Sequence, residues 1–165
     1  MFTVGILTIS TKGSRGERRD ESGQVVRELI SSLDARVVQY EIVPDDKETI
    51  SDRLIKWSDE LGLDLILTNG GTGLGPYDFT PEATLAVIEK PAPGFSEAMR
   101  LEGLKKTPLA ILSRGVSGAR GRTLIINLPG SPKAVRECLE VILPALPHAI
   151  EVLHGQVRDH SLEST

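Results

Sequence analysis

Short apolar runs of strand length alternate along the chain with longer segments in which apolar residues repeat every three or four positions. We expect strands at residues 3–10, 37–43, 63–69, 109–113 and 123–128. Helical spacing covers residues 22–33, 50–61, 95–101 and 132–152, with a further helix beginning near Thr80. This alternation predicts a mostly parallel central sheet covered on both faces by helices. The chain is therefore expected to form one three-layer α/β/α domain over residues 1–155, followed by a polar tail at 156–165.

Composition narrows the classes of partner. Hydrophobic residues make up 39% of 165, which is enough for one buried core. The net charge of -4 provides no global basic field, so we expect no sequence-independent binding to nucleic acid or to acidic membranes. No apolar run reaches the roughly 18 to 20 residues that cross a bilayer. The single cysteine, Cys138, favours a reducing compartment, and we expect a cytoplasmic protein.

A glycine-dense loop, Gly70–Gly75, follows the buried strand expected at 63–69. Without Cβ atoms in the way, its backbone amides can approach an anion closely. The loop has neither the lysine of a Walker loop nor the Gly-x-Gly-x-x-Gly order, and turns also need glycine. Four glycines in six residues nevertheless favour a phosphate-binding loop. Its candidate contacts are Gly70, Gly71, Thr72, Gly73 and Gly75.

Two aspartates follow predicted strand ends. Asp78 lies just beyond the glycine loop, where its carboxylate can hold a divalent cation or close an Asx turn before Thr80, and the spacing leaves both open. Asp45 follows Pro44, at the end of the second predicted strand. With Glu48 it has the spacing of a helix capping box, which the residues alone favour over catalysis.

Further polar and loop residues follow the other predicted strands. In an open α/β sheet, ligands bind at the carboxyl ends of the strands, where the strand order reverses. The segment from Pro129 to Lys133 also opens a helix, so it can bind an anion, cap that helix, or do both. The candidate contacts at these strand ends are Ser10, Ser113, Arg114, Pro129, Gly130, Ser131 and Lys133.

Five sequence pieces, taken in order, resemble the MogA/MoaB family. They are Pro44–Asp45, Gly70–Gly73, Asp78–Thr84, Leu112–Arg114 and Asn127–Lys133. Each piece alone is ambiguous, but the ordered set is specific, and the resemblance runs from Ile6 to Leu153. It implies a molybdopterin adenylyltransferase: the terminal phosphate of molybdopterin attacks the α-phosphate of ATP, in the presence of Mg²⁺, and pyrophosphate leaves.

The resemblance also implies roles for individual positions. Asp45 and Asp78 match the family's catalytic acids, with Asp78 as the expected Mg²⁺ ligand, and the glycine loop matches its nucleotide-phosphate site. The family is usually trimeric, and a partner protein that inserts molybdate is conceivable. The expected pterin contacts are Ser10, Ser113, Arg114, Pro129, Gly130, Ser131 and Lys133.

Three positions depart from the family pattern. Thr11 stands where many members have aspartate, Asn69 where many have threonine, and Tyr77 where many have arginine. A lost carboxylate and a lost cation weaken the case for ligand binding at those positions. They support the alternative that the chain is a non-catalytic molybdopterin-binding or carrier member of the family.

Overall fold

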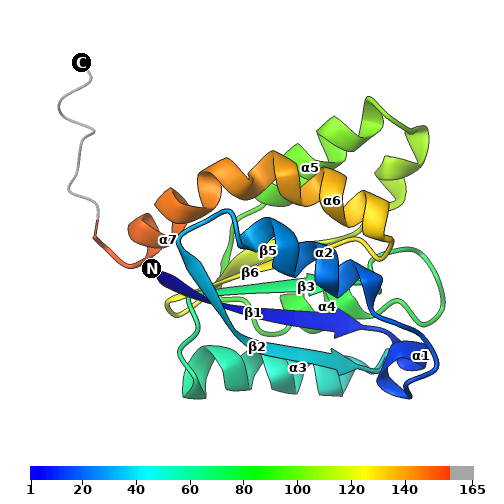
Figure 1. Ribbon diagram of the computed structural model, residues 1–165, viewed down its shortest axis with the longest axis horizontal. Coiled ribbons are helices and arrows are strands. Elements are labelled where there is room, and N and C mark those ends of the chain that lie inside the picture. Colours follow the sequence, from blue (N-terminus) through cyan, green and yellow to red (C-terminus); the bar gives the residue numbers. More distant parts are fainter. Residues whose placement is uncertain (157–165) are drawn as a thin grey trace.

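The computed structural model describes residues 1–156 and shows a six-stranded sheet (Figure 1). The strands are β1 Phe2–Ile9, β2 Ala35–Val43, β3 Leu65–Asn69, β4 Lys90–Pro91, β5 Ser117–Arg120 and β6 Thr123–Leu128. Their order is β2-β1-β3-β6-β5-β4. Strands β2, β1, β3 and β6 are parallel, whereas β5 and β4 add an antiparallel edge. The predicted, mostly parallel sheet is confirmed.

Helices cover both faces of this sheet. They are α1 Thr11–Ser14, α2 Glu21–Ile30, α3 Lys47–Ile55, α4 Thr80–Leu85, α5 Gly94–Leu104, α6 Pro132–Ile142 and α7 Leu146–Leu153, with the short η1 Lys56–Glu60, η2 Pro108–Leu112 and η3 Leu143–Ala145. Helices α2, α5, α6 and α7 lie on one face, and α3 and α4 lie on the other (Figure 1). The three-layer prediction is therefore confirmed.

The two helical layers divide the core because successive strand residues point to opposite faces. Leu65 and Leu67 pack with the layer of α2 and α6, whereas Ile66 packs with α3 and Trp57. Each such fully buried leucine or isoleucine contributes roughly 1.5–3 kcal/mol. Gly5 leaves room for the indole, since a Cβ there would lie 2.7 Å from Trp57 Cε3. The sheet's carboxyl end is thus positioned by a core that is tightly packed on both sides.

The strand predicted at 109–113 was wrong. This segment forms the 3-10 helix η2, which begins at Pro108 and is capped by Thr107, whose Oγ1 accepts a hydrogen bond from Leu109 N at 3.2 Å. Pro108 suits a first helical turn because its φ is fixed and it has no N–H to leave unpaired. Leu109 and Ile111 are 68% and 64% exposed, so their apolar character does not mark a buried strand.

Two segments that lie between the expected strands and helices contain regular structure. Residues 114–122, which are rich in glycine and arginine, include β5, which pairs with β6 through a hairpin in which Gly121 has φ +55°. The polar residues 11–20 include α1, whose first turn is capped by Ser10. Both elements are only four residues long, too short to produce a periodic apolar pattern.

The strand order reverses between β1 and β3. From β1 the chain crosses to β2 on one side, and β3 then joins β1 on the other side. The carboxyl ends of these strands, at the right of Figure 1, are therefore the topological switch point where α/β sheets bind ligands. Residues 157–165 of the predicted polar tail lie outside the described residues. Within the described part, no helix combines the length and apolar character needed to cross a membrane.

Candidate functional site at the switch point

The glycine loop begins with two residues that must be glycine. Gly70 and Gly71 have φ of +96° and +69°, in the left-handed region. A Cβ on Gly70 would lie 2.4 Å from the carbonyl oxygen of Ile9, and one on Gly71 would lie 2.4 Å from Thr80 Oγ1. The buried Thr80 anchors both residues: its hydroxyl donates to Gly70 O at 2.8 Å and its N–H donates to Gly71 O at 3.2 Å. The turn is therefore fixed before any ligand binds.

Arg114 holds the outer part of the same loop. Its Nε donates to Gly73 O at 2.7 Å, and its Nη2 donates to Asp78 O at 3.0 Å. Its Nη1 pairs with Glu82 Oε1 at 2.6 Å, and this bond lowers the pKa of the Glu82 carboxyl. The guanidinium was predicted as a pterin contact, but here its donors shape the glycine loop.

Asp78 does not close the Asx turn before Thr80 that its spacing allowed, because Thr80 N donates to Gly71 O at 3.2 Å instead. The carboxylate of Asp78 closes the glycine loop itself. Its Oδ2 accepts a hydrogen bond from Gly75 N at 2.8 Å, and its own N–H donates to Gly75 O at 3.1 Å. A Cβ on Gly73 or Gly75 would lie within 2.9 Å of the same oxygen, so the loop closes tightly around it. The other oxygen, Oδ1, accepts no hydrogen bond from the described residues and stays available for a ligand.

A cavity of about 710 Å³, the switch-point cavity, opens at the carboxyl ends of β1 and β3. The loops after β3 and β6 meet beside it, where Gly70 N donates to the carbonyls of Leu128 and Pro129 at 3.2 Å. A Cβ on Gly130 would lie 3.5 Å from Gly70 Cα. The cavity is lined by Thr8, Ile9, Ser10, Gly13, Arg18, Arg19, Asp20, Glu21, Ser22, Asp45, Asn69, Gly70, Gly71, Gly130, Ser131 and Pro132.

A second hollow, of about 390 Å³, adjoins this cavity around Asp45. Three of its lining residues, Ser10, Arg18 and Asp45, also line the switch-point cavity. Its complete lining is Ser10, Thr11, Lys12, Arg18, Asp45 and Tyr77, and we refer to it as the Asp45 hollow. Asp45 therefore stands where the two spaces meet.

Asp45 does not cap α3, so the predicted capping box was wrong. The cap is Asp46, whose Oδ2 accepts from Thr49 N at 3.0 Å and from Thr49 Oγ1 at 2.6 Å. These bonds lower the pKa of the Asp46 carboxyl. Asp45 instead accepts from Thr11 N at 3.1 Å and Thr11 Oγ1 at 2.8 Å. Thr11 therefore fixes the carboxylate of Asp45.

Sequence reasoning missed a chain of hydrogen bonds that crosses the switch point. Asn69 Nδ2 donates to Thr8 Oγ1 at 2.9 Å, and Thr8 Oγ1 donates to Asp20 Oδ2 at 2.7 Å. Asp20 also caps α2 by accepting from Gly23 N at 2.9 Å, and it accepts a bond from the Tyr40 hydroxyl. Burial and the bond to Asp20 raise the pKa of Tyr40. The signal that could have identified Asp20 is its position directly before α2, because aspartate is a preferred N-cap residue.

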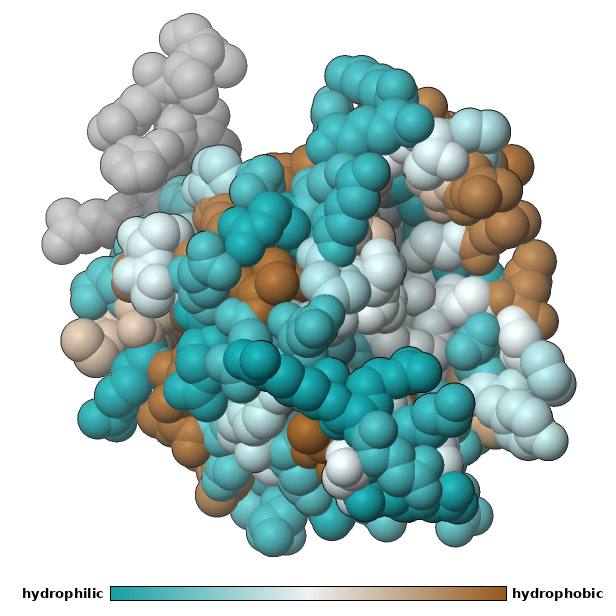
Figure 2. Space-filling view, turned by 45° about the vertical axis from the view of Figure 1, so that its right-hand side comes forward, coloured by the Kyte–Doolittle hydropathy of each residue, from teal (hydrophilic) through white to brown (hydrophobic). Residues whose placement is uncertain are grey.

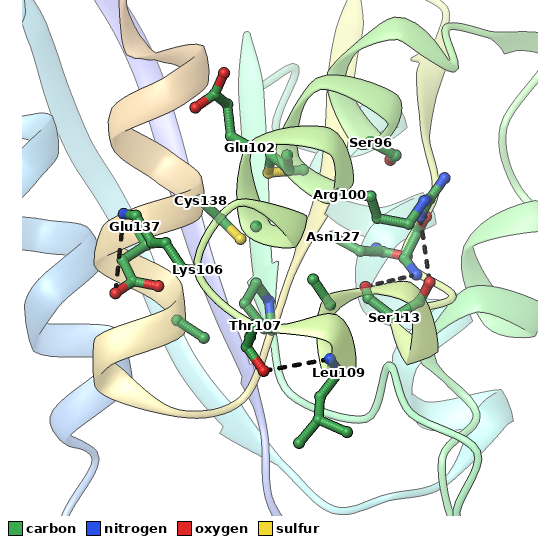
Figure 3. A pocket seen from close by; sticks show the side chains of 16 residues that line it. Ser96, Arg100, Glu102, Lys106, Thr107, Leu109, Ser113, Asn127, Glu137 and Cys138 are labelled. Carbon is green, nitrogen blue, oxygen red and sulfur yellow. Dashed lines mark hydrogen bonds and ion pairs between the residues drawn. The ribbon is translucent and has the colours of Figure 1, made fainter.

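A third hollow, of about 250 Å³, lies between α5, η2 and α6 (Figure 3). The Cys138 sulfur points toward it, and burial raises the pKa of that thiol. Ser113 and Pro129 line this apolar hollow rather than the switch-point cavity. Its lining is Ser96, Met99, Arg100, Glu102, Gly103, Lys106, Thr107, Leu109, Ala110, Ser113, Gly115, Asn127, Pro129, Ala134, Glu137 and Cys138.

The expected pterin contacts are therefore divided between two spaces. Ser10, Gly130 and Ser131 line the switch-point cavity, while Ser113 and Pro129 line the apolar hollow. Ser131 also caps α6, accepting from Ala134 N at 3.2 Å, which is one of the two roles predicted for it. Arg114 and Lys133 line neither of these spaces, and Lys133 is exposed.

The nucleotide contacts are divided as well, because Gly70 and Gly71 line the switch-point cavity and Thr72, Gly73 and Gly75 do not. In the described residues, no three histidine, cysteine, aspartate or glutamate side chains gather as a ready metal site. Mg²⁺ typically takes only one or two protein carboxylates and completes its shell with water and substrate phosphates. The free Oδ1 atoms of Asp45 and Asp78 fit that limited role.

Known proteins resemble this chain over most of its length. Residues 5–148 match the family model described as "Probable molybdopterin binding domain". A molybdopterin adenylyltransferase from Helicobacter pylori is 44% identical, with 98% of this chain and 94% of that protein aligned. Another, from Escherichia coli, is 37% identical, with 92% and 85% aligned.

Solved structures show the same resemblance in three dimensions. The molybdopterin biosynthesis enzyme MoaB from Thermus thermophilus is 57% identical and superposes with a TM-score of 0.90. That alignment covers 94% of this chain and 98% of the other. The chain therefore belongs to the family of molybdopterin-binding domains that includes MogA and MoaB.

Proposed function

We propose that this chain transfers the adenylyl group of ATP to the terminal phosphate of molybdopterin and releases pyrophosphate. One observation carries the proposal. The chain aligns with 94% of a molybdopterin adenylyltransferase, and the cavity at its topological switch point is lined by Asp45, by Gly70 and Gly71 of the glycine loop, and by Gly130 and Ser131. Transfer of this kind requires mainly positioning of the reactants and neutralisation of charge, and such a cavity supplies both.

The nucleotide phosphates are assigned to the glycine loop. The left-handed Gly70 and Gly71 leave backbone without side chains at the cavity wall, which lets phosphate oxygens approach. Thr72, Gly73 and Gly75 continue this loop outward, toward Asp78. Arg114 keeps its shape through bonds to Gly73 O and Asp78 O.

Asp45 and Asp78 are the proposed catalytic acids. Each has one oxygen fixed by the protein, through Thr11 or Gly75, and the other oxygen without a partner in the described residues. Mg²⁺ held by such an oxygen would supply positive charge for the negatively charged transition state. The bonds to Thr11 and Gly75 hold the two carboxylates in place. Asp45 lines both the switch-point cavity and the Asp45 hollow, whereas Asp78 lines none of the three hollows and stands beside the outer part of the glycine loop.

Molybdopterin is assigned to the side of the β6 loop. Ser10, Gly130 and Ser131 meet it in the switch-point cavity, and Ser113 and Pro129 extend the contact toward the apolar hollow. Lys133, exposed at the start of α6, approaches it from solvent. The adenylylated product is then a substrate for molybdate insertion, for which a separate partner protein is proposed.

A homotrimer is proposed from the resemblance, and the exposed apolar side chains of η2 support an interface between copies. Leu109, Ile111 and Leu112 are exposed on this short helix. The face shown in Figure 2 also carries a group of brown, hydrophobic side chains at its upper right. An exposed apolar patch of this kind marks an interface between proteins. Light scattering of wild type and Ile111→Glu tests the assignment, with three copies expected for the first and one for the second. A cytoplasmic location is proposed as well, and the single free cysteine, which suits a reducing compartment, supports it.

The decisive assay follows pyrophosphate release from ATP and Mg²⁺, with and without molybdopterin. Wild type is expected to release pyrophosphate only with the pterin, and Asp78→Asn is expected to lower the rate about 100-fold. Asp46→Asn is the matched control, because Asp46, like Asp78, lies outside the three hollows, but its carboxylate caps α3. Equal rates for wild type and Asp78→Asn overturn the role of that carboxylate.

A carrier that binds molybdopterin without turnover is the second candidate. Two observations favour it: Asp78 is engaged by its own loop, and the uncharged Tyr77 lines the Asp45 hollow. Tight pterin binding without pyrophosphate release, unchanged in Asp78→Asn, would establish this alternative. Pterin-dependent release excludes it.

A further inference from the structure

The basic residues expected at the site do not supply the positive charge that phosphate binding requires. Both substrates carry phosphate groups, yet the guanidinium of Arg114 is engaged with Glu82 and two loop carbonyls. Lys133 lines none of the three hollows, and position 77, in the Asp45 hollow, carries an uncharged tyrosine. The basic residues expected from the sequence therefore leave the phosphates without a cation at the cavity wall.

A different segment provides that charge. The residues between α1 and α2 include Arg18 and Arg19, and both line the switch-point cavity. Arg18 and Lys12 also line the Asp45 hollow. Neither arginine forms a hydrogen bond or an ion pair through its side chain within the described part of the chain. Their guanidinium groups are therefore free to meet a ligand.

The acidic groups around the cavity show why a cation is needed there. Asp20, Glu21 and Asp45 also line it, and carboxylates repel phosphate. The oxygens of Asp20 already accept bonds from Thr8, Gly23 and the Tyr40 hydroxyl. Within the described residues, Asp20 forms no ion pair with the arginines beside it in the sequence, so their guanidinium groups stay available.

We infer that Arg18, assisted by Arg19, binds the phosphate groups of the substrate between Asp45 and the glycine loop. Arg18 is placed for this because it borders both spaces that meet at Asp45. A guanidinium presents a planar set of donors that matches two phosphate oxygens at once. The inference rests on the proposed function, and it assigns to Arg18 the cationic contact that Tyr77 does not provide. The ligand chemistry is a phosphate ester or polyphosphate.

Binding measurements on the full chain test this without relying on turnover. Calorimetry with ATP, inorganic pyrophosphate and molybdopterin compares wild type with Arg18→Gln and with Arg18→Gln/Arg19→Gln. Loss of charge-assisted bonds is expected to weaken binding about 10- to 100-fold for the double variant. Arg15→Gln is the matched control, because Arg15 is exposed on the same segment and lines neither the cavity nor the Asp45 hollow. Melting curves verify that each variant is folded.

The ligands separate the possible sources of the phosphate. Weaker binding of ATP and pyrophosphate places the nucleotide at Arg18, and weaker binding of molybdopterin places the pterin phosphate there; either result supports the inference. Unchanged affinities in the double variant overturn it, as does an equal loss in Arg15→Gln, which indicates a diffuse charge effect.

The same measurements keep this inference distinct from the proposed function. Arginine-dependent pyrophosphate binding without pterin-dependent release supports the phosphate site and overturns the transferase. Pterin-dependent release that is undiminished in the double variant supports the transferase and overturns the role of Arg18.

Discussion

The sheet carries the same threonine–aspartate pair at both of its ends. At the carboxyl end, Asp45 Oδ2 accepts from Thr11 N and Oγ1, and Asp45 N donates to Thr11 Oγ1. At the amino end, Asp64 Oδ2 accepts from Thr3 N at 2.8 Å and Oγ1 at 3.2 Å, and Asp64 N donates to Thr3 Oγ1 at 3.1 Å. The two pairs use identical donors and acceptors to join neighbouring strands.

The pairs differ in what faces the second carboxylate oxygen. Asp64 Oδ1 lies 3.4 Å from Nε2 of His154, a side chain only 6% exposed. Asp45 Oδ1 has no partner in the described residues, and its residue faces the switch-point cavity and the Asp45 hollow. The same local chemistry therefore serves two purposes. At Asp64 the packed histidine takes up the second oxygen, so the pair stabilises the fold. At Asp45 a cavity lies beside the second oxygen, so an oriented carboxylate is available for a ligand.

The largest contrast between the ends is expected for their left-handed glycines. At the carboxyl end, Gly70→Ala places a Cβ 2.4 Å from Ile9 O in addition to straining the backbone. At the amino end, a Cβ on Gly121, with φ +55°, meets nothing within 4 Å. We expect unfolding free energies from urea titration to fall by about 3 kcal/mol for Gly70→Ala and about 1 kcal/mol for Gly121→Ala. Equal losses would contradict the fixed turn at Gly70.

The next contrast is between the two aspartates themselves. Asp45→Asn is expected to lower pterin-dependent pyrophosphate release about 100-fold, since a positioned carboxylate is lost, while stability changes little. Asp64→Asn is expected to lower stability by about 1 kcal/mol and to leave turnover within about twofold of wild type. Turnover is measured by the pyrophosphate assay and stability by urea titration. A variant of Asp45 that unfolds easily yet turns over normally would assign the residue to structure.

The sequence was sufficient to predict most of the fold, but it could not show which of Asp45 and Asp46 caps α3 and which faces the cavity. Buried strands such as β3 and amphipathic helices such as α6 have periodic apolar patterns, so layers and order were predictable. Asp45 and Asp46 are adjacent, and both fit a helix start. Only the backbone directions at the end of β2 decide that Asp46 reaches Thr49 and that Asp45 reaches Thr11.

The sequence could predict which segments form the candidate site, but not the hydrogen bonds that join them. The glycine loop and Asp45 could be selected because each follows a strand at the switch point. The sequence could not show whether Arg114 contacts a ligand or holds the loop, because its partners lie far from it in the chain. They are Gly73, Asp78 and Glu82. Hydrogen bonds between residues so far apart in the chain produce no recognisable spacing in the sequence.

A smaller effect is expected when the amino-end pair loses its histidine. Nε2 of His154 lies 2.9 Å from Arg122 O and near the Asp64 carboxylate, so two acceptors surround one ring nitrogen. His154→Leu leaves both without this partner and is expected to lower stability by about 1 kcal/mol, with turnover unchanged. His148→Leu is the control, because His148 is 69% exposed. Equal melting temperatures for the two variants would show that the contact between His154 and Asp64 does not stabilise the fold.

The smallest effect concerns the clamp on the glycine loop and its dependence on pH. The hydrogen bond from Arg114 lowers the pKa of Glu82 from its usual 4.5, so the folded state favours the ionised carboxylate. The resulting stabilisation is present above that usual value and is lost as the pH falls through the lowered value. The melting temperature of Glu82→Gln should therefore lie below that of wild type at neutral pH, and the two should converge as the pH falls through the lowered pKa of Glu82.

Glu140→Gln provides the comparison for that pH series, because Glu140 Oε1 lies 3.9 Å from Arg136 Nη1 on the exposed side of α6. Solvent screens such a pair, so this variant is expected to follow wild type at every pH. A gap between wild type and Glu82→Gln that stays constant into the acid range contradicts the ionised clamp. If the gap closes, the carboxyl end depends on charge to hold its loop, whereas the amino end relies on a packed histidine.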